Sequence, residues 1–454
     1  VVFMSAHAAK SYFSDALLKS DYYLSDQELP GQWHGLAAER LGLSGEVTKE
    51  GFFALADNCH PQTGLPITPG GDREHRRVGY DINFHCPKSV SVLHAMGLND
   101  GILPAFELSV NETMQDMEKD MQTRIRKGGQ YDDRQTGNMV WASFVHQAAR
   151  PTSEAPPDPH LHAHCYTFNM TFDSSENRFK AGQFVNLKRD GMYYQALFHK
   201  RLADRLQDLG YTIKKTKDAF EVLEVTEHAV QQFSKRTNHI GQVAQERGIT
   251  DKGELDKLGA KTRSAKQKGL SMPDLRQSWK KQLGKTPLLK AKQGVLMYPY
   301  SVKQCKDHAL RHSFERHSVV ANRAIIQEAV RHSMGSRSAS IEDIHSSVEN
   351  DSQLVRVVQQ GRVQCTTLEV LGEEQEMVSL AIEGRGAAKP LAMAPVSDFD
   401  NNRLSNEQKQ VINHILLNRD SVTLIQGRAG TGKTTMMTEA VKAIQKSGKQ
   451  VFAF

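Results

Sequence analysis

Three histidines alternate within the segment Pro159–His164, and their spacing constrains the fold more than any other feature of the chain. Residues two positions apart point to the same face of a β-strand, so His160, His162 and His164 predict a strand with one row of imidazoles. The residues between them are apolar and would face the opposite side. Neutral imidazoles in a row are ligands for a divalent metal. The alternative is a polar strand face of surface histidines, which a single histidine would favour.

Two further strand-like segments carry groups that fit the same site. The segment Gly137–Val145 leads into His146, and a proline-rich loop then joins it to the histidine strand. If the two strands pair, His146 supplies a ligand from the neighbouring strand. Asp81 lies in the alternating segment Tyr80–Phe84, where a carboxylate could orient a metal-binding histidine by accepting its other ring N–H. Taken alone, His146 fits better as an ordinary buried or edge histidine, and Asp81 is equally compatible with a plain aspartate at a strand end.

Tyrosines near the N-terminus could supply a nucleophile. Tyr12, Tyr22 and Tyr23 lie close together in the sequence. A tyrosine hydroxyl that attacks a phosphodiester forms a phosphotyrosine and frees a 3′-hydroxyl, so the break can be resealed without ATP. A phenol is a weak nucleophile at neutral pH, and a metal bound to the phosphate would compensate for this. Without other signals, these tyrosines would fit better as aromatic packing residues on a helix.

The composition agrees with an anionic partner but is weak evidence by itself. The chain has 454 residues and a net charge of +6, and its length suggests roughly two to four domains. Its five cysteines are widely spaced and form no CxxC pair, which argues against a disulfide framework and favours a reducing cytoplasm. We expect no membrane span and no signal peptide. Apolar residues at both ends suggest a fragment of a longer protein.

A second motif lies near the C-terminus. The segment Gly427–Thr434 fits the pattern G-x-x-x-x-G-K-[ST], follows a predicted strand at Val422–Ile425 and is expected to open a helix. Backbone N–H groups in such a loop cradle phosphates, the lysine reaches the β- and γ-phosphates, and the last residue coordinates Mg²⁺. The pattern therefore predicts an ATP site formed by Gly427, Gly430, Gly432, Lys433 and Thr434.

Several blocks of the N-terminal part together resemble the MobF-type conjugative relaxases, which are relaxase–helicases of the TraI and TrwC type. The likeness spans about Ser11 to Leu283 and is specific in combination. Its blocks are Ser11–Phe13, Asp21–Tyr23, Trp33–Gly35, Leu41–Val47, Gly79–Phe84, Pro87–Ser91, Thr136–Asn138, His146, Pro159–His164 and Phe233–Thr237.

The resemblance implies a metal site. In such relaxases three histidines hold the metal, and these match His146, His162 and His164 here. His160 stands where the family usually has glutamine, so the resemblance makes it a neighbour of the site and not a ligand. Asp81 matches the aspartate that supports a metal-binding histidine. The metal in use would be Mg²⁺ or Mn²⁺.

The resemblance also implies roles for the tyrosines and a fold. Tyr12 matches the primary nucleophile and Tyr22 the tyrosine of a second transfer, whereas Phe13 stands where many relatives have another tyrosine. The implied fold class is α+β, with an antiparallel-sheet palm of the HUH endonuclease type. A small helical domain and the truncated start of a P-loop α/β helicase domain would follow it.

The C-terminal part resembles the start of a superfamily 1 helicase. The segment Leu404–Gln410 is similar to the element of these helicases that recognises adenine, with Gln408 as the residue that contacts the base. The segment His308–Val348 is similar to the small domain that precedes the helicase motor in relaxase–helicases. Helix starts are expected in it at Ser318 and near Ser338. Because the chain stops before any Walker B carboxylate or arginine finger, we expect no ATP hydrolysis by this fragment. The expected domains are the relaxase at 1–285, a small helical domain at 286–383, a linker at 384–403 and the helicase part at 404–454.

The implied activity is nicking of one strand of plasmid transfer-origin DNA by metal-dependent tyrosine transesterification, with a 5′-phosphotyrosyl intermediate. Lys88, Arg236 and the basic stretch Lys261–Lys268 are candidates for DNA backbone contacts, although a basic stretch is also typical of a solvated helix face. The implied partners are single-stranded and supercoiled transfer-origin DNA, accessory relaxosome proteins and a type IV secretion coupling protein. The rivals are a rolling-circle replication initiator and a catalytically inactive DNA-binding remnant.

Overall fold

The computed structural model describes residues 2–17, 29–69, 77–127, 130–149, 156–249, 271–284 and 298–452, together with residues 251, 253–254, 258 and 288. The chain divides into two compact units. The first comprises Val1–Arg316 and Val320–Asp351, and the second comprises His317–Val319 and Ser352–Phe454.

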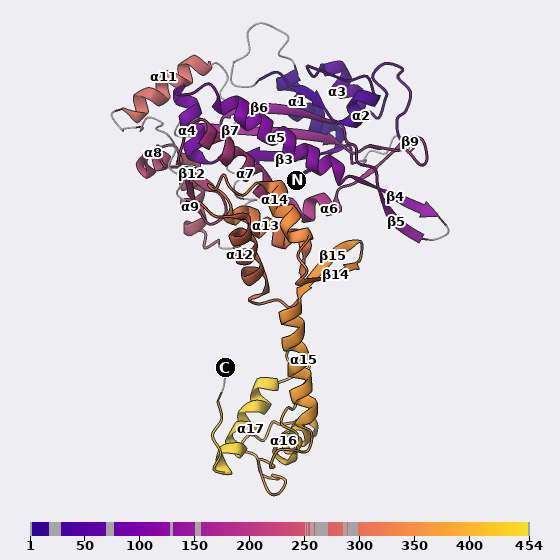
Figure 1. Cartoon of the computed structure of the whole chain (residues 1–454), viewed down its shortest axis with the longest axis vertical. Helices are drawn as coiled ribbons and strands as arrows, with labels where there is room; N and C mark the ends of the chain where they lie inside the picture. The colour runs from indigo at the N-terminus through magenta and orange to yellow at the C-terminus, as the bar shows by residue number, and fades with distance from the viewer. Residues whose placement is uncertain are drawn as a thin grey trace. The chain divides into compact units, whose positions relative to one another are not determined.

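A five-stranded sheet forms the centre of the first unit (Figure 1). Every neighbouring pair of strands in it is antiparallel. In spatial order its strands are β1 (Val2–Met4), β3 (Gly79–His85), β7 (Pro159–Phe168), β6 (Trp141–Ala148) and β2 (Gln32–His34). The strands predicted around Asp81, His146 and the alternating histidines are therefore confirmed. They are the three central strands, which brings these residues onto neighbouring strands.

Different helices cover the two faces of the sheet. On one face Phe13 of α1 packs in parallel against Phe144, with ring centroids 4.8 Å apart, and Phe52 of α3 contacts Tyr166 at 5.2 Å. On the other face Phe198 of α7 lies edge-on to Phe84 of β3 at 5.2 Å. Aromatic burial of this kind supplies much of the stabilising apolar area. The helices are α1 (Ala6–Leu17), α2 (Leu36–Arg40), α3 (Lys49–Ala56), α4 (Lys88–Met96), α5 (Ile102–Lys119), α6 (Val185–Arg189) and α7 (Gly191–Asp208).

Smaller sheets and three more helices surround this core. The hairpin of β4 and β5 projects from the unit (Figure 1). The small strands are β4 (Gln122–Lys127), β5 (Gln130–Gln135), β8 (Thr171–Asp173), β9 (Arg178–Lys180), β10 (Gly182–Gln183), β11 (Ile213–Lys215) and β12 (Phe220–Val222). The helices are α8 (Glu227–Gln232), α9 (Lys235–Glu246) and α11 (Met272–Leu283). In α11 the buried Trp279 donates from Nε1 to the Pro157 carbonyl at 2.8 Å, which ties this helix to the segment that leads into β7.

The helices α12 (Val302–Phe314), α13 (Asn322–His332) and α14 (Ile341–Glu349) also belong to the first unit. Arg323 of α13 donates to Asp120 at 2.6 Å and to Asp190 at 2.8 Å. Lys200 of α7 is fully buried and donates to the Ser336 carbonyl at 3.0 Å. These helices thus belong to the same compact unit as the five-stranded sheet. The prediction from the sequence was a small separate domain. The expected limits at 285, 383 and 403 stay a prediction.

The second unit contains a hairpin and three helices. Its elements are β14 (Leu354–Gln359), β15 (Arg362–Thr367), α15 (Leu368–Glu383), α16 (Asn406–Leu417) and α17 (Lys433–Lys446). Helices α16 and α17 enclose a small apolar core that includes Ile412, Leu416 and Ala440, all fully buried. The P-loop segment therefore belongs to the second unit and not to the one that holds the five-stranded sheet. This agrees with the predicted α+β protein followed by the start of a P-loop domain.

Two local predictions are wrong. The helix expected to start at Ser318 begins at Asn322, after the short strand β13 (Val320–Ala321). The strand expected at Val422–Ile425 is not formed among the described residues, and Leu424 there is 92% exposed. A strand needs a neighbour for its N–H and C=O groups, and in this unit β14 and β15 pair with each other. None of the described helices is long and apolar enough to cross a membrane.

Candidate metal centre

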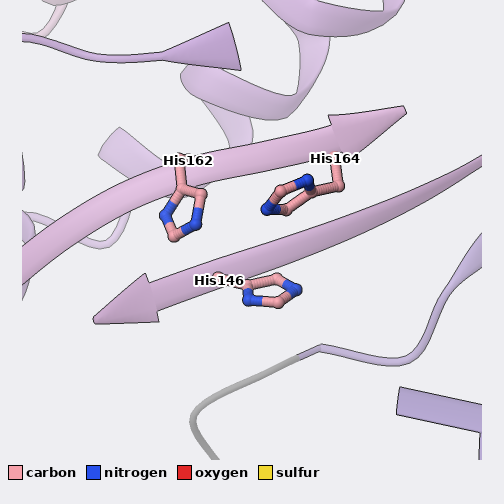
Figure 2. Close-up of side chains that lie close together, drawn as sticks. All are labelled: His146, His162 and His164. Atoms are coloured by element: carbon pink, nitrogen blue, oxygen red, sulfur yellow. The ribbon is translucent and has the colours of Figure 1, made fainter. Parts of the chain in front are cut away.

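Three histidines from two neighbouring strands converge on one face of the sheet (Figure 2). His162 lies directly opposite His146 in the register of β6 and β7, and His164 follows two residues later on the same face. One nitrogen of each ring lies within 4.8 Å of one nitrogen of each of the others. The alternation that the sequence showed and the antiparallel register together produce this cluster, and the strand pairing needed for His146 is present.

The outer nitrogens of two rings are held by acceptors. His164 Nδ1 lies 2.8 Å from Oδ2 of Asp81, and His162 Nδ1 lies 2.9 Å from the carbonyl oxygen of His160. A carboxylate and a carbonyl oxygen only accept, so both rings carry their proton on Nδ1. Nε2 of each ring then keeps its lone pair for a metal. Asp81 is 4% exposed and His164 is 8% exposed, so water does not compete for this bond.

Burial keeps His162 in the form that binds metal. Loss of hydration, with a smaller contribution from neighbouring His164, lowers the pKa of His162 to about 3. Its imidazole is therefore neutral at physiological pH. A cationic ring could not coordinate an ion, because its lone pair would be used by the proton.

The donor set fits a divalent first-row metal. Imidazole nitrogen is a common ligand for such ions, and three protein ligands leave coordination positions open for a substrate oxygen. His146, His162 and His164 are the residues that would hold the ion. Among the described residues no other group of three or more histidine, cysteine or acidic side chains converges in this way.

Two further polar residues of β3 also lie at this site. Asn83 is opposite His164 on β3, and with its amide nitrogen toward Asp81 it donates to Oδ1 at 2.8 Å. His85 lies opposite His162, and its Nδ1 is 3.1 Å from Nε2 of His160. The period-two alternation of β3 places both residues on the face of Asp81, and that signal was available in the sequence.

The helix that carries Tyr12 lies over the same face of the sheet. In α1 Ala9 and Phe13 are buried, and the Phe13 ring is edge-on to His164 with centroids 6.4 Å apart. Tyr12 precedes Phe13 in this helix, but its side chain lies outside what the structure describes. Tyr22 also lies outside the described residues. The phenylalanine at position 13 is thus part of the aromatic core.

The candidate DNA contacts lie beside the start of β7. The half-buried Lys88 donates from Nζ to the Pro159 carbonyl at 2.8 Å, and burial lowers the pKa of its ammonium group. Burial is the main cause that lowers the pKa of His160, with smaller contributions from the neighbouring His162, His85, Lys88 and Arg236. The side chains of Lys88 and Arg236 therefore lie near His160, the first histidine of the row on β7. The stretch Lys261–Lys268 lies outside the described residues.

In the second unit the predicted ATP-binding residues lie together. Gly430 and Gly432 have positive φ, and α17 begins at Lys433. Lys433 donates from Nζ to the carbonyls of Gly427 and Arg428 at 2.7 and 2.9 Å, and Gln408 donates to the Thr431 carbonyl at 3.1 Å. Thr434 occupies the second position of α17. Gln408 is also the last member of a capping box with Ser405 at the start of α16.

Comparison with protein families gives two matches. The sequence profile of the TrwC relaxase family matches residues 6–286, and that of an AAA domain matches residues 403–454. The multifunctional conjugation protein TraI of Escherichia coli strain K12 is 31% identical over 215 residues, which are 46% of this chain and 12% of that protein. The probable conjugal transfer protein TraA of Sinorhizobium fredii is 38% identical over 91 residues, or 8% of its length. The chain thus spans a small part of these relatives.

Solved structures of the conjugative relaxase TrwC share the fold. A metal-bound complex of TrwC with oriT DNA matches with a TM-score of 0.53 and 29% identity, over 61% of this chain and 93% of that one. A complex with mutant oriT DNA matches with a TM-score of 0.55 and 26% identity, over 63% and 98% of the two chains. The agreement in fold covers nearly the whole of those chains.

Proposed function

Because the chain belongs to the TrwC relaxase family, we propose that its first unit nicks one strand of transfer-origin DNA and attaches itself to the cut end through Tyr12. One observation carries this proposal, namely the three-histidine cluster with Asp81 behind His164, on the sheet face that α1 covers. Such a cluster can bind an ion with open positions beside the helix that bears the nucleophile.

The proposed reaction is a transesterification. The Tyr12 hydroxyl oxygen attacks the scissile phosphorus and loses its proton, the bond from phosphorus to the 3′-oxygen breaks, and that oxygen takes up a proton. The products are a 5′-phosphotyrosyl adduct and a free 3′-hydroxyl. A divalent ion, Mg²⁺ or Mn²⁺ by expectation, would polarise the phosphate and neutralise charge on its non-bridging oxygens. Asp81 keeps the His164 proton on Nδ1, so that Nε2 stays a ligand.

Other predicted residues complete the proposal. Tyr22 serves a second transfer that ends the reaction. Lys88 and Arg236, which lie near the end of the histidine row, contact the DNA backbone. In the longer protein the P-loop would bind ATP with Mg²⁺ for a motor. The family resemblance also implies that the protein is cytoplasmic and that its partners include accessory relaxosome proteins and a type IV secretion coupling protein.

The experiment is a cleavage assay on DNA from the element that encodes the chain. Tiled single-stranded oligonucleotides from its intergenic regions are incubated with the chain in Mn²⁺ or in EDTA, beside His162→Ala and the control His228→Ala, whose exposed histidine lies on α8. We expect one oligonucleotide to be cut at one position, only with metal, and by the control but not by His162→Ala. Tight binding without cleavage would instead support an inactive DNA-binding remnant.

A further inference from the structure

A pair of histidines, His85 and His160, adjoins the metal cluster and has no role in the proposed reaction. His85 on β3 lies opposite His162, and His160 precedes His162 by two residues on β7, so all three share one face. Nδ1 of His85 and Nε2 of His160 are 3.1 Å apart. Their ring centroids are 5.2 Å apart and their planes differ by 17°. Because the nitrogens are much closer than the centroids, the rings meet edge to edge in a hydrogen bond.

This hydrogen bond occupies one nitrogen of each ring and leaves the other nitrogen of each ring for a ligand. One ring must donate and the other must accept, since an N···N bond carries a single proton. When His160 donates from Nε2, His85 accepts at Nδ1 and carries its own proton on Nε2. That N–H lies on the side of the ring away from His160, and His85 is exposed. In this tautomer the pair presents one oriented N–H donor next to the metal cluster.

The surrounding charges favour an anion at this donor. Lys88 and Arg236 both act on His160, and the Asp81 carboxylate, which acts on His85, is already engaged by His164 Nδ1 at 2.8 Å. The carboxylates near Lys88 are already engaged, because Asp158 pairs with Lys235 at 3.2 Å and Glu221 accepts from the Ser89 amide at 2.9 Å. A positive local field disfavours a second cation and stabilises a phosphate.

We propose that the His85–His160 pair binds a backbone phosphate of the DNA strand adjacent to the scissile phosphate, with His85 Nε2–H as the donor and His160 as the residue that orients it. This inference rests on the proposed function. His160 acts through His85 and is a positioning residue, whereas His85 contacts the DNA. The pair would thereby set the register of the strand over the metal cluster.

The test combines protein variants with single neutral phosphates. Methylphosphonate replaces one phosphate at a time in the tiled oligonucleotide that the chain binds most tightly, and Kd is measured by fluorescence anisotropy whether or not the strand is cut. We expect His85→Ala to weaken binding of unmodified DNA roughly tenfold. A methylphosphonate at one position next to the cut should weaken binding of the wild-type chain by a similar factor and leave His85→Ala unchanged within about twofold.

A second pair of variants separates positioning from folding. His160→Gln keeps an N–H that can reach His85 and is expected to retain binding within roughly threefold, whereas His160→Leu should resemble His85→Ala. His228→Ala is the control. The proposal is overturned if the effects of His85→Ala and methylphosphonate multiply at every position, if His85→Ala binds normally, or if His85→Ala removes a second bound metal ion. Absence of cleavage with the phosphate effect intact would count against the proposed function alone.

Discussion

Replacing Asp81 by asparagine tests whether its carboxylate sets the metal affinity. Asp81 accepts at Oδ2 from His164 Nδ1 at 2.8 Å, and, with the Asn83 amide nitrogen turned toward it, at Oδ1 from that amide at 2.8 Å. An asparagine has one carbonyl oxygen for these two donors. If its NH2 group faced His164, the ring proton would have to move to Nε2, where it would block the lone pair that the metal needs.

The size of the effect follows from the burial of the pair. The side chains of His164 and Asp81 are 10% and 5% exposed, so water replaces little of the lost bond. A hydrogen bond to a charged partner contributes about 1.5–3 kcal/mol, and loss of such outer partners weakens metal binding by about 10- to 100-fold. We therefore expect the Kd for Mn²⁺ or Zn²⁺ to rise about 10- to 100-fold in Asp81→Asn.

The assay is isothermal titration calorimetry with the metal-stripped chain. Asp133→Asn is the matched control, because its carboxylate pairs with Arg124 on the β4–β5 hairpin, away from the histidines. His162→Ala, which removes a ligand, sets the upper limit of the loss. A Kd for Asp81→Asn within twofold of wild type, together with loss of binding in His162→Ala, would refute the role given to this carboxylate.

Three further predictions follow from other parts of the chain. Burial lowers the pKa of His199, which is 4% exposed, to about 4, so below pH 6.5 the unfolded chain takes up a proton that the folded chain refuses. Because of this residue, the free energy of unfolding should fall by about 3 kcal/mol as the pH drops from 6.5 to 4. In urea unfolding measured at the two pH values, His199→Leu should not show this part of the loss. Equal losses in the wild-type chain and in His199→Leu would contradict the prediction. Arg323→Ala removes the donors to Asp120 and Asp190 and should lower the free energy of unfolding by about 2 kcal/mol. Arg337→Ala removes an exposed ion pair with Asp208 and should lower it by less than about 1 kcal/mol. Equal losses in the two variants would count against the role of Arg323 in holding α13 in the first unit. Lys433→Ala should abolish binding of a fluorescent ATP analogue and leave DNA cleavage unchanged, and reduced cleavage would show that the two units are coupled.

The sequence predicted the strands and the histidine face because both depend on local periodicity. Alternation alone placed His162 and His164 on one side of a strand. The position of His146 beside them depended on the register of β6 and β7, and the family resemblance supplied what periodicity could not. The bond between His85 and His160 spans 75 residues and depends on the pairing of β3 with β7, so no local pattern could reveal it.

The predictions that failed depend on tertiary context. Ser318 fits a helix start, but the next residues enter the short strand β13 and the helix begins at Asn322. Val422–Ile425 has the composition of a buried strand, yet a strand forms only where a neighbour accepts its hydrogen bonds. The docking of α13 rests on Arg323, whose partners Asp120 and Asp190 are 203 and 133 residues away. Charged pairs so distant leave no signal in a single sequence.

The central claim is that Tyr12 becomes covalently joined to DNA at the three-histidine centre. The most direct measurement is mass spectrometry of peptides from the chain after incubation with the cleaved oligonucleotide in Mn²⁺, beside Tyr12→Phe, Tyr22→Phe and an EDTA control. We predict a nucleotide adduct on the peptide that contains Tyr12, absent in EDTA and in Tyr12→Phe and present in Tyr22→Phe. An adduct on Tyr22 that persists in Tyr12→Phe, or cleavage without any adduct, would contradict the account.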